Sequence, residues 1–428
     1  MIFSLFKRKT AKLPKGYQEL ISPDAMNIVS TLKEAGFETY LVGGCVRDIL
    51  LKRPSKDFDI ATSAGPEQVK KLLHRSQIIG RRFKIVVARR RLKPSSDLKR
   101  ELFPVFHDRP PIEEFQITTF RSKPAWDEEA QKMNENVYGS AKEDAYRRDF
   151  TINALFMDPT NSKVVDYVGG SKDIEARLLR VIGDPRERFK EDSIRILRAL
   201  RFAKRNDLKL ESDTKKALLE QMTYLRDAKK ERIREEILKI WREGVQAETF
   251  QEMKTLGLWK HLSPLYARNF ETHKEDFKKL LSVGKAVSKT PWNNPRLAAP
   301  FFFLMAPDFF LGGSKKGKSH IDELIAKLNV SKKEYEDMQA IRENIQRLGN
   351  DRTKGARFFR KHPRSYEIIS QSMYVLKILG DAGDKHCSKL WKKWERPWVV
   401  YKNECATLFG KPRGGHPRRR TRKRRPPR

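Results

Sequence analysis

Two aspartates separated by one residue are the first candidates for chemistry in this sequence. Asp57 and Asp59 flank Phe58 in a stretch, 56–61, that is predicted to be a strand. Alternate residues of a strand share a face, so both carboxylates should point the same way while Phe58 enters the core. Adjacent carboxylates repel each other unless a cation lies between them. Because Mg²⁺ prefers oxygen ligands, the pair predicts a metal site.

A pair of glycines precedes the two aspartates. Gly43 and Gly44 follow the apolar end of a shorter predicted strand, and 46–51 is predicted to be helical. Glycine permits a tight turn that a Cβ would block. A helix N-terminus presents free N–H groups and a positive dipole end to an anion. The glycine turn therefore predicts a phosphate site beside the metal site, with Arg47 and Asp48 in the joining helix.

Each feature alone has a simpler interpretation. An Asp-x-Asp pair is most often surface charge, and a Gly-Gly pair is usually only a turn. Glycosyltransferases also use Asp-x-Asp, to hold a nucleotide-sugar diphosphate through a metal. The combination of both features at this spacing is much more specific than either one.

In this combination the sequence resembles the nucleotidyltransferases that add nucleotides to RNA 3′ ends. These are the bacterial poly(A) polymerases and the CCA-adding enzymes of the eubacterial class, and the resemblance extends over roughly residues 25–245. It implies an α+β fold with an N-terminal nucleotidyltransferase head, in which helices flank a small mixed sheet, followed by an all-α neck and body. It also implies that Gly43, Gly44, Arg47 and Asp48 bind the nucleotide.

A second motif combines cations, a carboxylate and an amide. Arg147, Arg148 and Asp149 lie at a predicted helix start, and Asn153 follows one turn after Asp149. Asn and Asp can bind ribose hydroxyls and Arg a phosphate, although an amphipathic helix with a charged cap is an equally simple interpretation. The run R-R-D-F-T-x-N-A resembles the family residue by residue. This implies ribose and triphosphate binding by Arg148 and Asn153, and makes Asp149 a candidate third catalytic carboxylate.

A third motif lies in the segment 191–203, which is predicted to be one helix. It places Asp192, Arg195 and Arg198 along one strip, as an ordinary amphipathic helix with internal ion pairs also would. In the family, Glu-Asp-x-x-Arg on this helix reads the base edge of the incoming nucleotide. The resemblance implies that role for Glu191, Asp192, Arg195 and Arg198. The choice between ATP alone and CTP with ATP would depend on how rigidly the strip is held.

The third metal ligand and the identity of the product depend on two further segments. Relatives commonly have Glu where Gln116 stands, and Glu114 on the same face is not assigned to that role. The run 78–83, Ile-Ile-Gly-Arg-Arg-Phe, resembles the poly(A) polymerase version and is usually absent from CCA-adding enzymes. This run favours a poly(A) polymerase.

Three connecting segments are expected to be irregular. The loop 91–113 should join two strands of one hairpin, and 126–138 should be a flexible insert that orders over substrate. Asp166, Gly169 and Gly170 are predicted to end a strand in a flexible turn, which in relatives joins head to neck.

The charge balance indicates a polyanionic partner. Lysine and arginine exceed the acidic residues by 36 charges, which suits nucleic acid or an anionic membrane. No apolar run approaches the roughly 18–20 residues that span a bilayer. The C-terminal 408–428 is rich in Arg and lacks acidic residues, so it predicts a disordered, salt-sensitive arm for nucleic acid.

The three cysteines show no metal or disulfide spacing, which indicates a reducing compartment. The first residues lack the order of a secretory signal. The expected location is the bacterial cytoplasm, and organellar import has only weak support.

The sequence predicts five regions: a basic N-terminal arm (1–24), a catalytic head (25–172), a helical neck with the base-binding helix (173–260), a helical RNA-binding body (261–407) and the Arg-rich tail. The predicted reaction is template-independent transfer of AMP from ATP to the 3′-hydroxyl of mRNA or small RNA, with release of pyrophosphate. Two Mg²⁺ ions roughly 3.5–4 Å apart would assist, held by Asp57 and Asp59. The alternatives are CCA or A addition to tRNA by the same centre, and a non-catalytic basic RNA-binding protein. No membrane partner is expected, and protein partners stay open.

Overall fold

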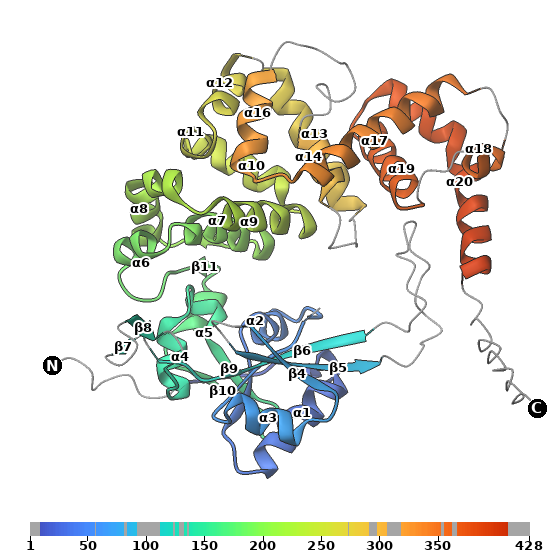
Figure 1. The fold of residues 1–428 in the computed structure, drawn as a ribbon. Coiled ribbons are helices and arrows are strands. Elements are labelled where there is room, and N and C mark those ends of the chain that lie inside the picture. The colour runs from blue at the N-terminus through green and yellow to red at the C-terminus, as the bar shows by residue number, and fades with distance from the viewer. Residues whose placement is uncertain are drawn as a thin grey trace, which may run out of the picture.

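The computed structural model describes residues 9–55, 57–80, 84–91, 112–122, 125–127, 132–134, 137–272, 274–290, 298–305, 318–351, 355–361 and 366–409. An α/β part lies below a layer of helices, and further helices lead away to the C-terminal helix (Figure 1). We call residues 9–175 the head, helices α6–α10 the neck and helices α11–α20 the body. The basic residues of the 78–83 run, the 92–111 part of the predicted loop and the predicted tail from 410 onward lie outside the described residues.

The head is built on a mixed sheet, as predicted. Within the described residues its eight strands follow the order β1-β10-β9-β2-β3-β6-β5-β4. β3 and β6 pair in parallel, and the other neighbours are antiparallel, including the β5–β6 hairpin predicted around the loop 91–113. The strands are β1 (Lys9–Ala11), β2 (Thr39–Val42), β3 (Asp59–Thr62), β4 (Ser76–Ile79), β5 (Ile85–Arg91), β6 (Ile112–Thr119), β9 (Leu155–Asp158) and β10 (Lys163–Asp166).

The two faces of the sheet pack against different helices because successive strand residues alternate. On one face, Leu41 and Ile60 join the core cluster that contains α1 (Pro23–Glu34) and α3 (Pro66–Leu72). On the other, Val42 and Ala61 contact the cluster that includes α4 (Ala141–Arg147). Asp59 lies two residues before Ala61, and therefore on the α4 face.

The turn after β10 is tightly bonded, and the prediction of a flexible turn was wrong. The Asp166 carboxylate accepts hydrogen bonds from the backbone N–H groups of residues 168–171 and from the Ser171 hydroxyl. A Cβ on Gly170 would lie 2.1 Å from the Thr151 carbonyl oxygen. These contacts fix the start of α5 (Gly170–Glu175), so this turn is not a free pivot between head and neck.

The neck contains the predicted base-binding segment, but as two helices. α6 (Pro185–Glu191) ends at Glu191, and α7 (Ile194–Asn206) begins after Ser193. Asp192 between them is extended, and its Oδ1 accepts the N–H of Ile194 at 3.3 Å. The single helix over 191–203 was therefore wrong, because a carboxylate that bonds a nearby backbone N–H competes with helix continuation. The other neck helices are α8 (Ser212–Gln221), α9 (Lys230–Arg242) and α10 (Gln246–Thr255).

The body is entirely helical where it is described. The tryptophans that the structure describes there are core residues, as predicted, and Trp394 and Trp398 are almost completely buried. Trp292, also predicted to be a core residue, lies outside the described residues. Of the helices in the described ranges, none combines the length and apolar character that a membrane span needs. The body helices are α11 (Trp259–Leu262), α12 (Pro264–Thr272), α13 (Lys274–Lys289), α14 (Ala299–Met305), α16 (Lys318–Lys327), α17 (Lys332–Asn350), α18 (Arg357–Lys361), α19 (Tyr366–Asp381) and α20 (Lys385–Phe409).

Candidate active site

The predicted carboxylate pair lies at the start of a central strand. Asp59 begins β3, Asp57 lies just before it, and Phe58 between them is buried. Both aspartates are accessible to water. Protein nevertheless surrounds Asp59 closely, so desolvation raises its pKa; Arg148 opposes this shift and the charge of Asp57 adds to it. The two carboxylates are thus close enough to repel each other, as expected of a site that needs a cation.

The glycine turn lies directly beside Asp59. Val42 and Asp59 are paired in register on β2 and β3, which brings the following Gly43 next to the carboxylate. Gly43 has φ +77°, a conformation that favours glycine. A Cβ at this position would lie 3.4 Å from Arg148 Nη1 and 4.0 Å from Asp59 Oδ2. The absent side chain thus lets a cation and a carboxylate approach the backbone, and α2 (Gly44–Leu50) starts from the same turn.

Arg148 of the second motif is held in place by residues of α4, the following turn and the sheet. Its Nη2 lies 2.8 Å from Asp144 Oδ2, its Nη1 donates to the Asn153 carbonyl oxygen at 3.3 Å, and its guanidinium lies 5.3 Å from the centre of the Phe156 ring. The predicted helix start was wrong, because α4 ends at Arg147 and Arg148 is extended. A capping box between Ser140 and Glu143 starts this helix earlier.

Arg47 and Asp48 are buried and bonded to each other. Arg47 donates to Asp48 Oδ1 at 2.9 and 2.7 Å, and its Nη1 donates to Asn153 Oδ1 at 2.7 Å. Asn153 lies in a short 3₁₀ turn, η2 (Thr151–Asn153). In this conformation Arg47 positions the Asn153 side chain from the protein interior. Direct nucleotide contacts by Arg47 and Asp48 stay a prediction.

Two arginine guanidiniums and the backbone N–H of a third arginine share one buried carboxylate next to this site. Asp144 lies 4.0 Å from Arg147 Nη1, contacts Arg148 as above, and accepts the backbone N–H of Arg121. Desolvation lowers the pKa of Arg121 and of Arg147, and repulsion between the guanidiniums adds to both shifts. This excess of positive charge suits a polyphosphate. Sequence reasoning missed Arg121, although it ends the β6 motif Thr-Thr-Phe-Arg.

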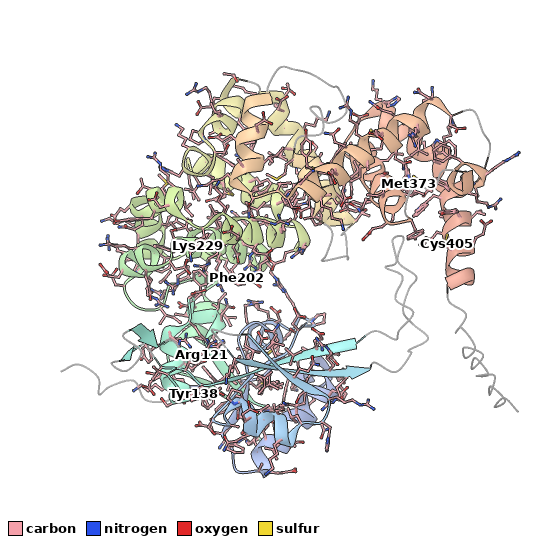
Figure 2. All side chains as sticks on the ribbon, in the orientation of Figure 1. Arg121, Tyr138, Phe202, Lys229, Met373 and Cys405 are labelled. Carbon is pink, nitrogen blue, oxygen red and sulfur yellow. The ribbon has the colours of Figure 1, made fainter. Side chains whose placement is uncertain are left out.

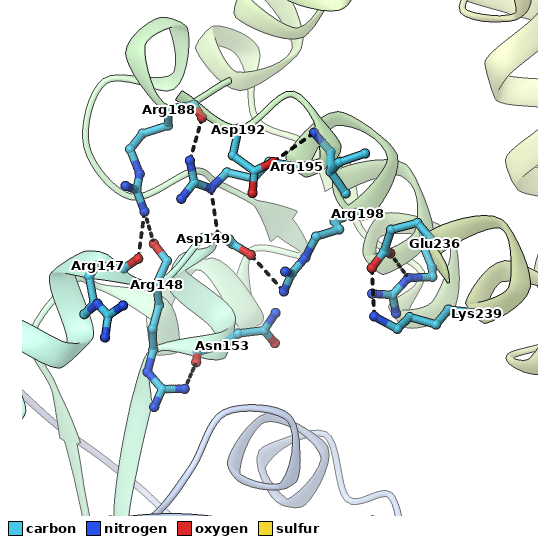
Figure 3. Close-up of polar contacts among 12 residues, drawn as sticks. Arg147, Arg148, Asp149, Asn153, Arg188, Asp192, Arg195, Arg198, Glu236 and Lys239 are labelled. Atoms are coloured by element: carbon cyan, nitrogen blue, oxygen red, sulfur yellow. Dashed lines mark hydrogen bonds and ion pairs between the residues drawn. The ribbon is translucent and has the colours of Figure 1, made fainter. Parts of the chain in front are cut away.

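Asp149 links the head to the neck. Its Oδ1 accepts from Arg195 Nε and its Oδ2 lies near Arg198 Nη2, both at 2.8 Å (Figure 3). Burial alone would raise the pKa of Asp149, but the two guanidiniums hold it below the ordinary value. Because both oxygens are engaged by neck residues, this geometry is that of a structural link. A role for Asp149 as a third catalytic carboxylate stays a prediction.

The predicted base-reading residues are also held by fixed partners. Asp192 is bound through both oxygens by Arg232 of α9, at 2.8 and 2.7 Å. Glu191 Oε2 accepts from Arg195 at 2.8 Å and from Arg188 at 2.7 Å. Arg188 also donates to the carbonyl oxygens of residues 147 and 148 in the head (Figure 3). Arg232 and the head contacts of Arg188 were missed because the partners in those contacts are distant in sequence.

Two buried donors in this region have no partner among the described residues. They are Nε of Arg188 and Nε of Arg198. A buried donor without an acceptor costs free energy, so a bound ligand that supplies acceptors would be stabilised at this boundary between head and neck.

Gln116, which stands where relatives commonly have a third acidic ligand, lies next to Asp59. Gln116 on β6 is in register with Asp59 on β3. Glu114 is engaged elsewhere, since Arg89 Nε lies 2.6 Å from its Oε1. In the part of the chain that the structure describes, no three His, Cys, Asp or Glu side chains form a metal-binding group. Two carboxylates with an adjacent amide oxygen still fit Mg²⁺, which often keeps waters and takes substrate phosphates as ligands.

Two family models match the chain, one over the head and one over part of the neck and the start of the body. Residues 39–180 match the poly A polymerase head domain, and residues 207–269 match the probable RNA and SrmB-binding site of polymerase A. The first match contains the glycine turn, the aspartate pair and the arginine cluster. These two regions of the chain are therefore similar to the head and RNA-binding domains of poly(A) polymerases. The predicted family resemblance is confirmed.

Poly(A) polymerases and CCA-adding enzymes both match this chain. Poly(A) polymerase I of Haemophilus influenzae is 37% identical over 265 residues, which cover 60% of this chain and 54% of that protein. The CCA-adding enzyme of Lactobacillus helveticus is 38% identical over 216 residues, covering 50% of this chain and 49% of that protein. The chain thus spans about half the length of the curated relatives it matches.

Solved structures of the family share the fold. The Bacillus stearothermophilus CCA-adding enzyme in complex with CTP has a TM-score of 0.61 at 22% identity, covering 92% of this chain and 90% of that chain. The Thermotoga maritima CCA-adding enzyme complexed with tRNA has a TM-score of 0.53 at 20% identity, covering 92% of this chain and 86% of that chain. The predicted α+β fold, with a nucleotidyltransferase head and helical remainder, is confirmed.

Proposed function

We propose that this protein transfers AMP from ATP to RNA 3′-hydroxyl groups without a template and releases pyrophosphate. The observation that carries the proposal is the pair of water-accessible carboxylates, Asp57 and Asp59, which lies beside the Gly43 turn and Arg148. Asp57 and Asp59 are the proposed ligands of Mg²⁺. When bound there, Mg²⁺ would neutralise phosphate charge and favour the ionised 3′-hydroxyl nucleophile.

The remaining residues position the nucleotide. Arg148, with Arg147 and Arg121 around Asp144, is proposed to bind the triphosphate. The amide of Asn153, oriented by Arg47, is proposed to bind the ribose. Catalysis of this kind consists mainly of positioning and charge stabilisation.

Preference for ATP is supported by the rigidity of the base-reading strip. Asp192 has both oxygens bound by Arg232, and Arg195 is bound by Asp149 and Glu191. Acceptors and donors that cannot reorient present one fixed hydrogen-bond pattern, which suits one base. An enzyme that takes CTP and then ATP would need this pattern to change between additions.

CCA addition to tRNA is the second candidate, supported by the similarity to the Lactobacillus helveticus CCA-adding enzyme. The test is incubation of the purified protein with Mg²⁺ and an mRNA fragment, and separately with tRNA lacking CCA, each with ATP or CTP. Long A tails on the fragment would support polyadenylation. CTP incorporation into tRNA would support the second candidate and contradict the first.

The non-catalytic alternative is tested in the same assay. RNA binding without incorporation of any nucleotide would overturn the proposed enzyme. Loss of incorporation in Asp57→Asn, with RNA binding retained, would exclude a binding-only protein. A role in mRNA processing and a cytoplasmic location stay predictions.

A further inference from the structure

One face of α7 contacts the head along most of the helix. Arg195, Arg198, Phe202 and Arg205 recur at a spacing of three or four residues, which places them on one side. Arg195 and Arg198 bind Asp149, and Arg205 Nη2 lies 3.8 Å from Asp48 Oδ2. We call these four residues the head-facing stripe. It joins the base-reading positions to the helix that follows the glycine turn.

Phe202 is the apolar centre of the head-facing stripe. It is 9% exposed and meets Phe150 of the head edge-to-face, with ring centres 5.7 Å apart. The guanidiniums of Arg47 and Arg198 lie 5.8 and 5.9 Å from the centre of its ring. Figure 2 places Phe202 where the neck meets the head. One ring therefore contacts a residue beside the phosphate turn and a residue of the base-reading strip.

The side of α7 next to the head-facing stripe is bonded firmly to the neck, and the Arg201 guanidinium there also lies 4.2 Å from the centre of the Phe202 ring. Arg201 donates to Glu236 at 2.9 Å and to Glu243 at 2.6 Å, and both Arg201 and Glu236 are buried. Glu243 also accepts from Arg205 at 3.1 Å. Any change in the fit between α7 and the head would therefore move the base-reading residues together with the neck.

We propose that Phe202 is a positioning residue that sets the spacing between head and neck, and thereby selects a purine nucleotide over a pyrimidine. This inference rests on the proposed function, in which phosphates bind the head and the base meets Asp192 and Arg195 of the neck. With the phosphates fixed, the distance from head to neck determines how large a base reaches those two side chains. A smaller residue at 202 lets α7 approach the head and favours the smaller base of CTP.

The test compares Phe202→Leu with a matched control, Phe250→Leu. Phe250 is more deeply buried, at 1% exposed against 9% for Phe202, and it packs against Trp241 and Trp259 within the neck and body. Both variants lose a buried ring, so both should lower the melting temperature. We expect Phe202→Leu to lower the ratio of kcat/KM for ATP to that for CTP on the order of 10-fold, the scale of discrimination by fit. Phe250→Leu should leave the ratio unchanged.

The inference would be overturned if the ratio of kcat/KM for ATP to that for CTP were equal in the two variants. It would also be overturned if Phe202→Leu lowered kcat/KM for ATP and for CTP by the same factor. If Phe202→Leu does not fold, Arg205→Gln replaces it, because it weakens the same joint without changing core volume. We expect a smaller shift of the ratio in the same direction, and an unchanged ratio would contradict the role of the stripe.

Failure of the proposed function can be recognised separately. If the wild-type protein incorporates no nucleotide, the proposed enzyme fails, and the Kd values for ATP and CTP are then measured by equilibrium binding. If the preference for binding ATP over CTP, given by the ratio of the two Kd values, becomes smaller in Phe202→Leu but not in Phe250→Leu, the positioning role is supported. A ratio that is unchanged in both variants overturns it.

Discussion

The two acidic regions of this protein have opposite electrostatics. Asp57 and Asp59 are accessible to water, yet the protein around Asp59 desolvates it enough to raise its pKa, although Arg148 opposes the shift. Asp149 lies only a short distance along the chain from the arginine cluster, yet Arg195 and Arg198 engage both of its oxygens and hold its pKa low. The first region has unsatisfied charge and should bind a ligand. The second has satisfied charge and should hold the head on the neck.

The largest expected effect is loss of catalysis in Asp59→Asn. Removal of one proposed metal ligand should reduce nucleotide incorporation by at least about 10²–10³-fold, as when a group that stabilises developing charge is lost. The melting temperature should stay equal or rise, because the variant removes a carboxylate whose charged form is disfavoured by desolvation and, to a smaller extent, by Asp57. Asp207→Asn is the control, since Asp207 is exposed at the end of α7. A variant with full incorporation would remove Asp59 from the mechanism.

In contrast to Asp59→Asn, Asp149→Asn should lower the stability of the protein. Loss of one partner of a buried pair typically costs about 3–5 kcal/mol, and we expect about 2 kcal/mol because the Arg198 side chain is 32% exposed. Urea unfolding measures this change in the free energy of unfolding. Glu275→Gln, which breaks an exposed pair with Lys278, is the control with little expected change. A cost no larger than in this control would contradict the linking role of Asp149.

Arg232→Gln separates selectivity from stability. The variant frees both oxygens of Asp192, so the ratio of kcat/KM for ATP to that for CTP should fall several-fold. Stability should change little, because the Arg232 side chain is 48% exposed. Arg186→Gln breaks another exposed pair of the neck, with Glu220, and should leave the ratio unchanged. An unchanged ratio in Arg232→Gln would mean that the rigidity of Asp192 does not determine base choice.

The smallest expected effect is on the pH dependence of stability, measured in EDTA. The raised pKa of Asp59 favours folding below the ordinary carboxyl pKa, and this contribution is lost as pH rises through the folded value. The lowered pKa of Asp149 favours folding above the ordinary value, and this contribution is lost as pH falls through the folded value. Relative to wild type, Asp59→Asn should therefore gain stability with rising pH, and Asp149→Asn should lose it. Changes of the same sign would show that the two regions do not differ as described.

The motifs of the head were predictable because the chemistry they need is encoded locally. Alternation on a strand predicted that Phe58 is buried and that Asp57 and Asp59 remain accessible, and the structure agrees. The Gly43 turn followed from steric limits on the backbone, and its φ of +77° bears this out. The mixed sheet and the helical neck and body followed from hydrophobic periodicity and family resemblance.

Local patterns failed where a side chain bonds the backbone or a distant partner. The spacing of Asp192, Arg195 and Arg198 fits one helix. The Asp192 carboxylate instead accepts from the N–H of Ile194 and from Arg232, so Asp192 leaves the helix. The same holds for Asp166, whose carboxylate closes a turn that its glycines suggested was flexible. In both cases a carboxylate satisfied by specific donors outweighed the local propensity.

The sequence alone determined the types of residue that could bind metal, phosphate, ribose and base, because these depend on spacing within one element. Only the tertiary structure decided which charged groups remain accessible to a ligand and which are engaged in ion pairs within the protein. Arg47, Asp149 and Arg148 were all predicted as site residues from sequence motifs. In the structure, however, Arg47 is buried against Asp48, and Asp149 pairs with arginines of α7. The physical reason is that an ion pair forms between groups brought within a few ångströms by folding, and sequence separation does not report that distance.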